Sequence, residues 1–122
     1  MAKLTEEAKK AIAEFGAALV ATASKDGKPN VSLKGSFRVL DDEHVIFADI
    51  ASPRTMANLR ENPQLSVMVF DPSTCKGCRV WGKAVEILDS GSLFDTISAE
   101  FAAKGMKVNH IVKVAVDEVT TF

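Results

Sequence analysis

The spacing of apolar residues along the chain predicts three helices separated by short strands. Apolar side chains recur at helical spacing over residues 5–16, and the same spacing returns over residues 92–104. A shorter helix is predicted over residues 52–62, because Ser52 is a favourable N-cap residue and Asn62-Pro63 stops a helix. These helices fall at the connections between strands.

Strands are predicted wherever apolar residues alternate with polar ones or form short runs bounded by turn residues. Asp26-Gly27 is a strong turn signal, and Asp41-Asp42 marks a second turn, so consecutive strands should run antiparallel. The predicted strands are residues 18–23, 30–40, 44–49, 65–70, 80–88 and 110–116. This order predicts a mainly β fold, a six-stranded antiparallel barrel with about three peripheral helices.

The segment Leu65–Phe70 is apolar almost throughout, unlike a strand that is wetted on one face. We therefore expect both of its faces to be covered. One face would fill the barrel interior, and the other would meet a helix, a cofactor or a second subunit.

Composition narrows the class of protein without identifying it. The 122 residues suit one domain, residues 1–122, and a net charge of −1 without a basic stretch gives no indication of a nucleic-acid partner. The sequence shows no signal-peptide pattern and no apolar run long enough for a membrane span. A cytoplasmic protein that binds neither nucleic acid nor membrane is the expectation.

The short helix over residues 52–62 carries the most informative candidate chemistry. Its first turn offers free backbone N–H groups and the positive end of a dipole beside Arg54 and the hydroxyl of Thr55. Asn58 lies one turn later on the same face. This combination suits an anion such as a phosphate. The alternative is an ordinary capped connector helix whose charges are solvated.

Cys75 and Cys78 form a single Cys-x-x-Cys motif. A structural zinc site needs four ligands, and a thioredoxin-type motif opens a helix after a strand, whereas this pair precedes an apolar strand. We interpret the pair as a feature of the loop over residues 71–79, with no metal site assigned. A metal or redox role stays open because a dimer would bring two pairs together.

Four segments together resemble one known family. They are Lys-Pro-Asn-Val-Ser-Leu-Lys-Gly-Ser-Phe (28–37), Val-Ile-Phe-Ala-Asp (45–49), Arg-Thr-Met-Ala-Asn-Leu-Arg-Glu-Asn-Pro (54–63) and Val-Trp-Gly-Lys-Ala (80–84). In this order and spacing they resemble the pyridoxamine 5′-phosphate oxidase-like flavoproteins, and in size the small bacterial FMN-binding proteins of that superfamily. The resemblance implies an FMN-binding split barrel that works as a homodimer, with the flavin at the subunit interface.

The resemblance also places the FMN contacts on particular residues. They fall on the second strand, the end of the third and the short helix, at Ser32, Leu33, Lys34, Gly35, Ser36, Ala48, Asp49, Arg54, Thr55 and Asn58. Arg79 and Trp81 occupy the region from which the partner subunit approaches the flavin. The oxidases begin the helix with an Arg-Lys pair, whereas the Arg54-Thr55 pair here is closer to the Lys-Thr of the small FMN proteins.

Several of these residues have simpler interpretations that stay open at this point. Lys34 would bring positive charge near the flavin ring, or it is a solvated strand residue. Ser32 and Ser36 are outward polar positions if they do not touch the ligand. Asp49 would accept hydrogen bonds from the ribityl hydroxyls, or it initiates a turn. Trp81 would stack near the ring or across the dimer interface, or belong to the core.

The sequence contains no Ser-His-Asp arrangement, paired carboxylates or Walker loop, so an activity would come from a bound cofactor. We expect an FMN protein that transfers electrons or hydride between an unknown donor and acceptor, with no catalytic side chain assigned. The oxidases continue past the last strand with substrate-binding Arg and His residues, and this sequence ends at Phe122, so we expect a reaction other than pyridoxamine-phosphate oxidation. The alternatives are a binding or sensing barrel for deazaflavin, haem or another phosphorylated or planar ligand, and a metal or redox sensor based on the two cysteines.

Overall fold

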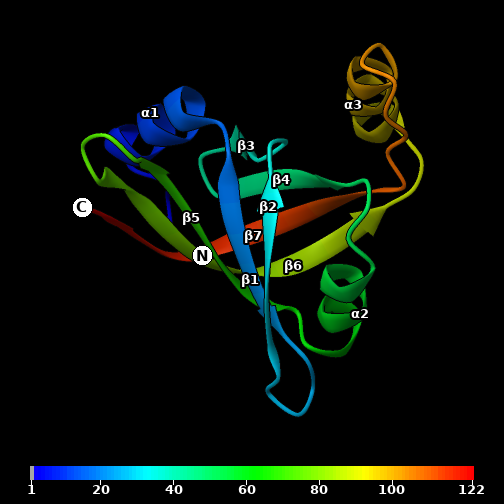
Figure 1. Ribbon diagram of the computed structural model, residues 1–122, viewed down its shortest axis with the longest axis horizontal. Helices are drawn as coiled ribbons and strands as arrows, with labels where there is room; N and C mark the ends of the chain where they lie inside the picture. The colour runs from blue at the N-terminus through cyan, green and yellow to red at the C-terminus, as the bar shows by residue number, and fades with distance from the viewer. Residues whose placement is uncertain (1) are drawn as a thin grey trace.

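The computed structural model of the protein describes residues 2–122, and Figure 1 shows a curled antiparallel sheet with three helices around it. The elements in chain order are α1 (Glu6–Phe15), β1 (Ala18–Ala23), β2 (Pro29–Lys34), β3 (Arg38–Asp41), β4 (His44–Asp49), α2 (Pro53–Glu61), β5 (Gln64–Asp71), β6 (Lys76–Leu88), α3 (Ser92–Ala102) and β7 (His110–Thr121). The mainly β barrel with three peripheral helices is therefore confirmed.

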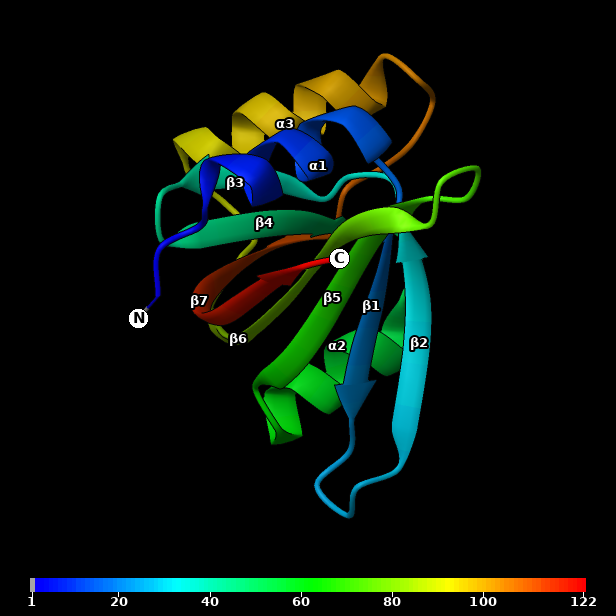
Figure 2. The same ribbon diagram turned by 90° about the vertical axis from the view of Figure 1, so that its left-hand side faces the viewer.

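The strands form one sheet in the order β2-β1-β5-β6-β7-β4-β3, so β2 and β3 are its two edges (Figure 2). In a flat sheet, six gaps of about 4.8 Å would hold these edges about 29 Å apart. The chain crosses from Lys34 to Arg38 directly, a reach of about 14 Å at most. The sheet must therefore curl into a barrel, and residues 35–37 close its seam.

The seam corrects the predicted strand over residues 30–40. The structure divides it into β2 and β3, with a turn at Gly35-Ser36, so the sheet has seven strands rather than six. The alternation of apolar residues continues on both sides of the turn, and periodicity alone therefore does not reveal that the two halves lie at opposite edges.

The hairpin between β5 and β6 corrects a second expectation. The predicted loop over residues 71–79 is a tight turn, in which Cys75 adopts a positive φ of 58°. As a result β6 begins at Lys76, four residues earlier than predicted, and Cys78 lies inside the strand. The last strand is also longer than predicted, since it continues to Thr121.

Two apolar clusters build the core. The larger cluster fills the barrel interior, with inward side chains such as Val20, Val67, Val80 and Val114, and α1 packs over one end against β5 and β6. The smaller one lies beneath α3 and consists of Ile46, Ala48, Ile97, Phe101, Val108 and Ile111. Because side chains from both faces of β4 are buried, that strand is covered on both sides.

The apolar segment Leu65–Phe70 is covered less completely than expected. In β5, the inward residues are buried, whereas the outward residues Ser66, Met68 and Phe70 are only half-buried. The single chain therefore leaves the outer face of this strand partly open.

The long pair β6–β7 depends on the glycine at position 82. A Cβ atom there would lie 2.4 Å from the carbonyl oxygen of Ala115, so the backbones approach too closely for any side chain. The register of the two strands also shifts between Trp81 and Gly82. Glycine is thus required where the ladder changes register.

Among residues 2–122, none of the helices combines the length and the apolar character needed to cross a bilayer.

Candidate functional site

The edge strand β2 has two different faces. Ser32 and Lys34 point inward, whereas Val31 and Leu33 point outward and are 62% and 68% exposed. The strand pairs only with β1, so the backbone groups along its other edge have no ladder partner within the described chain. This edge therefore offers hydrogen-bond donors and acceptors beside apolar side chains.

A cavity of about 400 Å³ lies beside this edge, and we call it the β2 cavity. A Cβ atom on Gly35 would meet nothing within 4 Å, so the turn leaves open space. The lining residues are Ser32, Leu33, Lys34, Gly35, Ser36, Ala48, Ile50, Ala51, Phe101, Lys104 and Met106. The structure thus brings half of the predicted site residues to one cavity, opposite a wall from the end of α3 that the sequence did not indicate.

Lys34 is buried rather than solvated. Its Nζ donates a hydrogen bond to Ser52 Oγ and lies 5.9 Å from the centroid of the Phe47 ring. Burial lowers the pKa of Lys34, although the negative charge of Asp49 acts in the opposite direction. The structure therefore places a cation with restricted hydration on the wall of the β2 cavity.

Ser36 is also buried, and its Oγ accepts a hydrogen bond of 2.8 Å from the N–H of Ala48. This contact ties the turn at the seam to the end of β4. Ser36 is therefore not an outward polar residue, and Ser32 is half-buried.

Asp49 ends β4 and lies directly opposite His110 in the β4–β7 ladder. One carboxylate oxygen accepts hydrogen bonds from the hydroxyl (2.7 Å) and the N–H (3.3 Å) of Ser52, and the other lies 2.8 Å from Nδ1 of His110. Burial opposes ionisation, but the hydrogen bonds from His110 and Ser52 outweigh it and lower the pKa of Asp49. The bond to the Ser52 N–H is the local turn that begins the β4–α2 connection.

The start of α2 leaves polar groups without partners in the described chain. Ser52 occupies the N-cap position, but its hydroxyl is used by Asp49 and no side chain caps the helix. Thr55 is 1% exposed, and its Oγ1 has no hydrogen-bond partner among residues 2–122. Arg54 is exposed and forms no ion pair with any residue from 2 to 122.

Arg54 and Asn58 line a smaller cavity of about 170 Å³, which we call the α2 cavity. The β1–β2 hairpin supplies the other side, through Ser24, Lys28, Pro29 and Asn30. Asn58 is held in place by a 3.1 Å bond from its Nδ2 to Thr22 Oγ1. Lys28 and Asn30 were not predicted as site residues, although both lie in the segment that carried the family resemblance.

Thr55 does not line the α2 cavity, because its side chain points into the protein. Arg79 and Trp81 also lie elsewhere, on the outer face of β6, where the Arg79 guanidinium carbon is 5.8 Å from the Trp81 ring centroid. Trp81 is half-buried, so it is not a core tryptophan. The cross-strand neighbours of Trp81 are Ser66 on β5, then Ala21 on β1, then the exposed Val31 on β2.

A third cavity, of about 830 Å³, lies on the other side of the β4–α2 connection, and we call it the His110 cavity. It shares Ile50 and Ala51 with the β2 cavity, so the connection is the wall between them. His110 was not predicted as a site residue, since it lies 61 residues from Asp49 and only strand pairing brings the two together.

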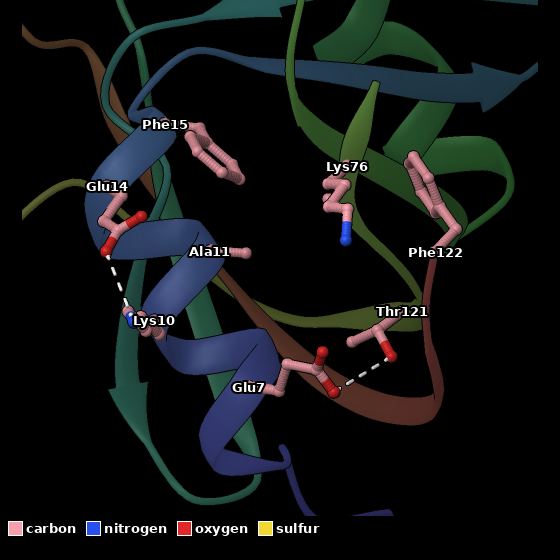
Figure 3. A pocket seen from close by; sticks show the side chains of 9 residues that line it. Glu7, Lys10, Ala11, Glu14, Phe15, Lys76, Thr121 and Phe122 are labelled. Atoms are coloured by element: carbon pink, nitrogen blue, oxygen red, sulfur yellow. Dashed lines mark hydrogen bonds and ion pairs between the residues drawn. The ribbon is translucent and has the colours of Figure 1, made fainter. Parts of the chain in front are cut away.

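A further cavity lies between α1 and the ends of β6 and β7, where Phe15 and Phe122 face each other across Lys76 (Figure 3). Its polar side chains largely satisfy one another, as in the 3.3 Å hydrogen bond from Thr121 to Glu7. None of the predicted site residues lines it, so it is not part of the candidate site.

The two cysteines differ in their exposure to solvent. Cys75 is exposed in the β5–β6 turn, whereas Cys78 is buried against α1, and burial raises the pKa of its thiol to about 11. Both are free thiols, and residues 2–122 contain no group of three potential metal ligands. The interpretation as a loop feature therefore holds only for Cys75.

Comparison with known proteins gives a family and several structural relatives. The family model described as pyridoxamine 5′-phosphate oxidase matches residues 4–122. An uncharacterized protein of Methanocaldococcus jannaschii is 34% identical over 119 residues, which cover 92% of this chain and 79% of that protein. HupZ of Group A Streptococcus is 26% identical with a TM-score of 0.85, covering 98% of this chain and 94% of that structure.

Other solved structures share the fold at lower identity. An FMN-binding protein of Syntrophomonas wolfei has a TM-score of 0.85 at 19% identity, covering 95% of this chain and 84% of that structure. An F420 reductase (21%, covering 96% and 98%) and the haem storage protein HutZ of Vibrio cholerae (22%, covering 98% and 94%) both have TM-scores of 0.71. The same fold therefore occurs in proteins named for three different ligands.

Proposed function

The chain belongs to the pyridoxamine 5′-phosphate oxidase family, and from this membership we propose that it is an FMN-binding flavoprotein that transfers electrons or hydride as an oxidoreductase. The observation that carries the proposal is the placement of the β2 cavity and the α2 cavity along the same edge strand. One cavity suits a planar ring and the other suits a phosphate, as the two ends of FMN require.

The α2 cavity supports the phosphate end of the proposal. Arg54 has a free guanidinium that binds a phosphate in fork geometry, and Lys28 adds a second cation from the hairpin. The uncapped N–H groups at the start of α2 add the positive end of a helix dipole.

The β2 cavity supports the ring end. The free backbone edge of β2 provides donors and acceptors for the polar edge of an isoalloxazine ring, and Gly35 leaves room beside it. When bound, FMN supplies hydride and one-electron chemistry. The task of the chain is then to bind and orient it, and Lys34 would favour negative charge at the ring.

The proposal includes a homodimer in the cytoplasm with the flavin between the subunits. Val31 and Leu33 expose apolar surface on the outside of β2, and the outer face continues across β1 and β5 to Arg79 and Trp81. A second copy seated on this face would cover the exposed side chains and bring its own Arg79 and Trp81 toward a neighbouring flavin.

The test of the phosphate site is Arg54→Ala. Loss of one charge-assisted interaction should weaken FMN binding by about 1.5–3 kcal/mol, or about 10- to 150-fold in Kd, in a fluorescence titration. Arg60→Ala is the matched control, because Arg60 lies in the last turn of the same helix and carries the same charge. Equal affinity for the Arg54→Ala variant and the unmodified protein would remove Arg54 from the site.

The absorption spectrum of the purified protein separates the proposal from its rivals. Flavin bands support FMN, a deazaflavin spectrum indicates a ligand like that of the F420 reductase, and a Soret band indicates haem. A colourless protein that also fails to take up added FMN would contradict the proposed function.

A further inference from the structure

We infer that His110 is the proton-exchanging catalytic residue of the site, positioned by Asp49, and that it acts on a quinone oxygen of a substrate in the His110 cavity. The inference rests on the proposed oxidoreductase function. It arises from a hydrogen-bond chain that joins the two cavities through the β4–α2 connection.

The chain of hydrogen bonds has one consistent direction. Lys34 Nζ donates to Ser52 Oγ, the Ser52 hydroxyl donates to Asp49, and the Asp49 carboxylate only accepts, so Nδ1 of His110 must carry its proton. Fixing the proton on Nδ1 leaves Nε2 as the reactive nitrogen. Nε2 makes no hydrogen bond within residues 2–122, and His110 lines the cavity with a side chain that is about a quarter exposed.

The arrangement holds His110 in place from several directions. Asn109, its neighbour, donates its backbone N–H to the Asp49 carbonyl at 2.8 Å and its side-chain amide to the Ile50 carbonyl at 3.0 Å. Asn109 therefore fastens the start of β7 to the end of β4 directly beside His110. A residue fastened in this way loses little freedom when a substrate binds.

A quinone needs one proton for each of the two electrons that it gains. Bound FMN would supply the electrons, which can cross the β4–α2 connection, whereas a hydride would need direct contact between the ring and the substrate. Each electron leaves negative charge on a quinone oxygen. The Nε2–H of protonated His110 donates its proton to that oxygen, which leaves neutral imidazole, and water at the open cavity restores the proton. Asp49 keeps the proton on Nδ1 throughout and stabilises the imidazolium.

Four charged groups face this part of the molecule. Asp49 contacts the imidazole, Asp89 and Arg60 line the same cavity, and Lys34 lies behind Ser52. Two of these groups are carboxylates and two are cations. Arg60, which lines the cavity, would stabilise negative charge that develops on a substrate oxygen.

The first test uses the protein without added flavin. ¹⁵N-detected imidazole spectra should show neutral His110 protonated at Nδ1, and Asp49→Asn should lose this preference while His44 keeps its own signals. A neutral His110 protonated at Nε2 in the unmodified protein would overturn the inference, whether or not FMN binds.

The second test uses the FMN-loaded protein after reduction, mixed with either menadione or ferricyanide in a stopped-flow instrument. Menadione takes protons with its electrons, whereas ferricyanide takes electrons alone. His110→Asn retains an amide N–H that can donate to Asp49 but lacks Nε2. It should slow the menadione reaction about 100-fold or more and leave the ferricyanide reaction unchanged.

The control is His44→Asn, which should leave both reactions unchanged. A His110→Asn variant that binds FMN normally and reacts with menadione at the unmodified rate would overturn the role of His110 while the proposed function stands. Equal slowing with both acceptors would also overturn it, because it would indicate a general disturbance of the site. If the unmodified protein binds no FMN, the proposed function itself fails.

Discussion

The chain has two histidines, and the structure pairs each of them with an aspartate in the same way. Nδ1 of His44 lies 2.8 Å from Asp41 in the β3–β4 turn, and Nδ1 of His110 lies 2.8 Å from Asp49 at the end of β4. The Asp41 side chain is 53% exposed, whereas the Asp49 side chain is 7% exposed. Identical distances therefore occur in very different surroundings.

The surroundings decide what each carboxylate contributes. Hydrogen bonds from the Glu43 backbone and from His44 lower the pKa of Asp41, and water competes with both. The pKa of Asp49 is lowered in spite of burial, because His110 and Ser52 together supply the bonds that water cannot. A His–Asp distance alone therefore does not identify a functional pair, whereas a buried carboxylate with a second set of donors does.

The largest expected difference in stability is between the variants Asp49→Asn and Asp41→Asn. Asp49→Asn should lower the free energy of unfolding by about 3 kcal/mol at pH 7, because it removes a buried charged acceptor from Ser52 and His110 and the negative charge near Lys34. Asp41→Asn should cost less than about 1 kcal/mol. Urea unfolding of the flavin-free proteins measures both values.

The stability that Asp49→Asn loses should depend on pH, in a direction that the pKa of Asp49 predicts. The folded-state pKa of Asp49 is below the unfolded value of 3.8, so its contribution is present above pH 3.8 and is lost as the pH falls through the folded pKa. The difference in free energy of unfolding between Asp49→Asn and the unmodified protein should therefore become smaller in strong acid. A deficit that is equally large at pH 7 and at the acid limit would contradict the assignment to the carboxylate charge.

A smaller effect is expected for Ser52→Ala. The change removes one donor to Asp49 and leaves the buried Lys34 ammonium without its hydroxyl partner, at a cost of about 2 kcal/mol. Ser73→Ala is the control, because the Ser73 hydroxyl donates to Asp71 at 2.8 Å in an exposed turn. Its cost should stay within about 0.5 kcal/mol. Equal losses in the two variants, measured by urea unfolding, would remove the distinction between buried and exposed networks.

The smallest expected effect is a change in the slope of stability against pH in alkaline solution. Burial puts the folded-state pKa of Lys34 below the unfolded value of 10.5, so the unfolded chain binds more protons between the two values and stability rises there with pH. Lys34→Met should remove this rise, which thermal unfolding between pH 8 and 10.5 would detect. Lys83→Met, on the exposed outside of β6, should keep the slope of the unmodified protein.

The sequence specified local elements well where local signals were strong. The predicted strands at residues 18–23 and 44–49 match β1 and β4, and a capping threonine with a terminal glycine located α1. The segment 30–40 was wrongly predicted as one strand, because Gly35-Ser36 lies between two alternating segments and carries no strong turn signature. Whether such a dipeptide bends the chain depends on the curvature of the whole sheet.

The candidate site shows the same limit. Residues 32–36 were predicted as site residues from the family resemblance, and Arg54 was predicted both from the resemblance and from the chemistry of a helix start. Asp49 was identified as a polar end to an apolar strand, but its partner His110 was not, because the register between β4 and β7 is set by long-range pairing. The buried state of Lys34 was also not predictable, since it depends on Ser52 reaching it across the connection.

The seam at residues 35–37 has one further consequence. Every neighbouring pair of strands in the sheet is joined by a ladder, whereas its two edges, β2 and β3, share none and are linked by this segment. Cleavage of the peptide bond between Gly35 and Ser36 would leave all of these ladders intact, and the seam would then be held by side-chain bonds such as the one from Lys34 to Ser52. At this position covalent continuity therefore replaces a strand ladder.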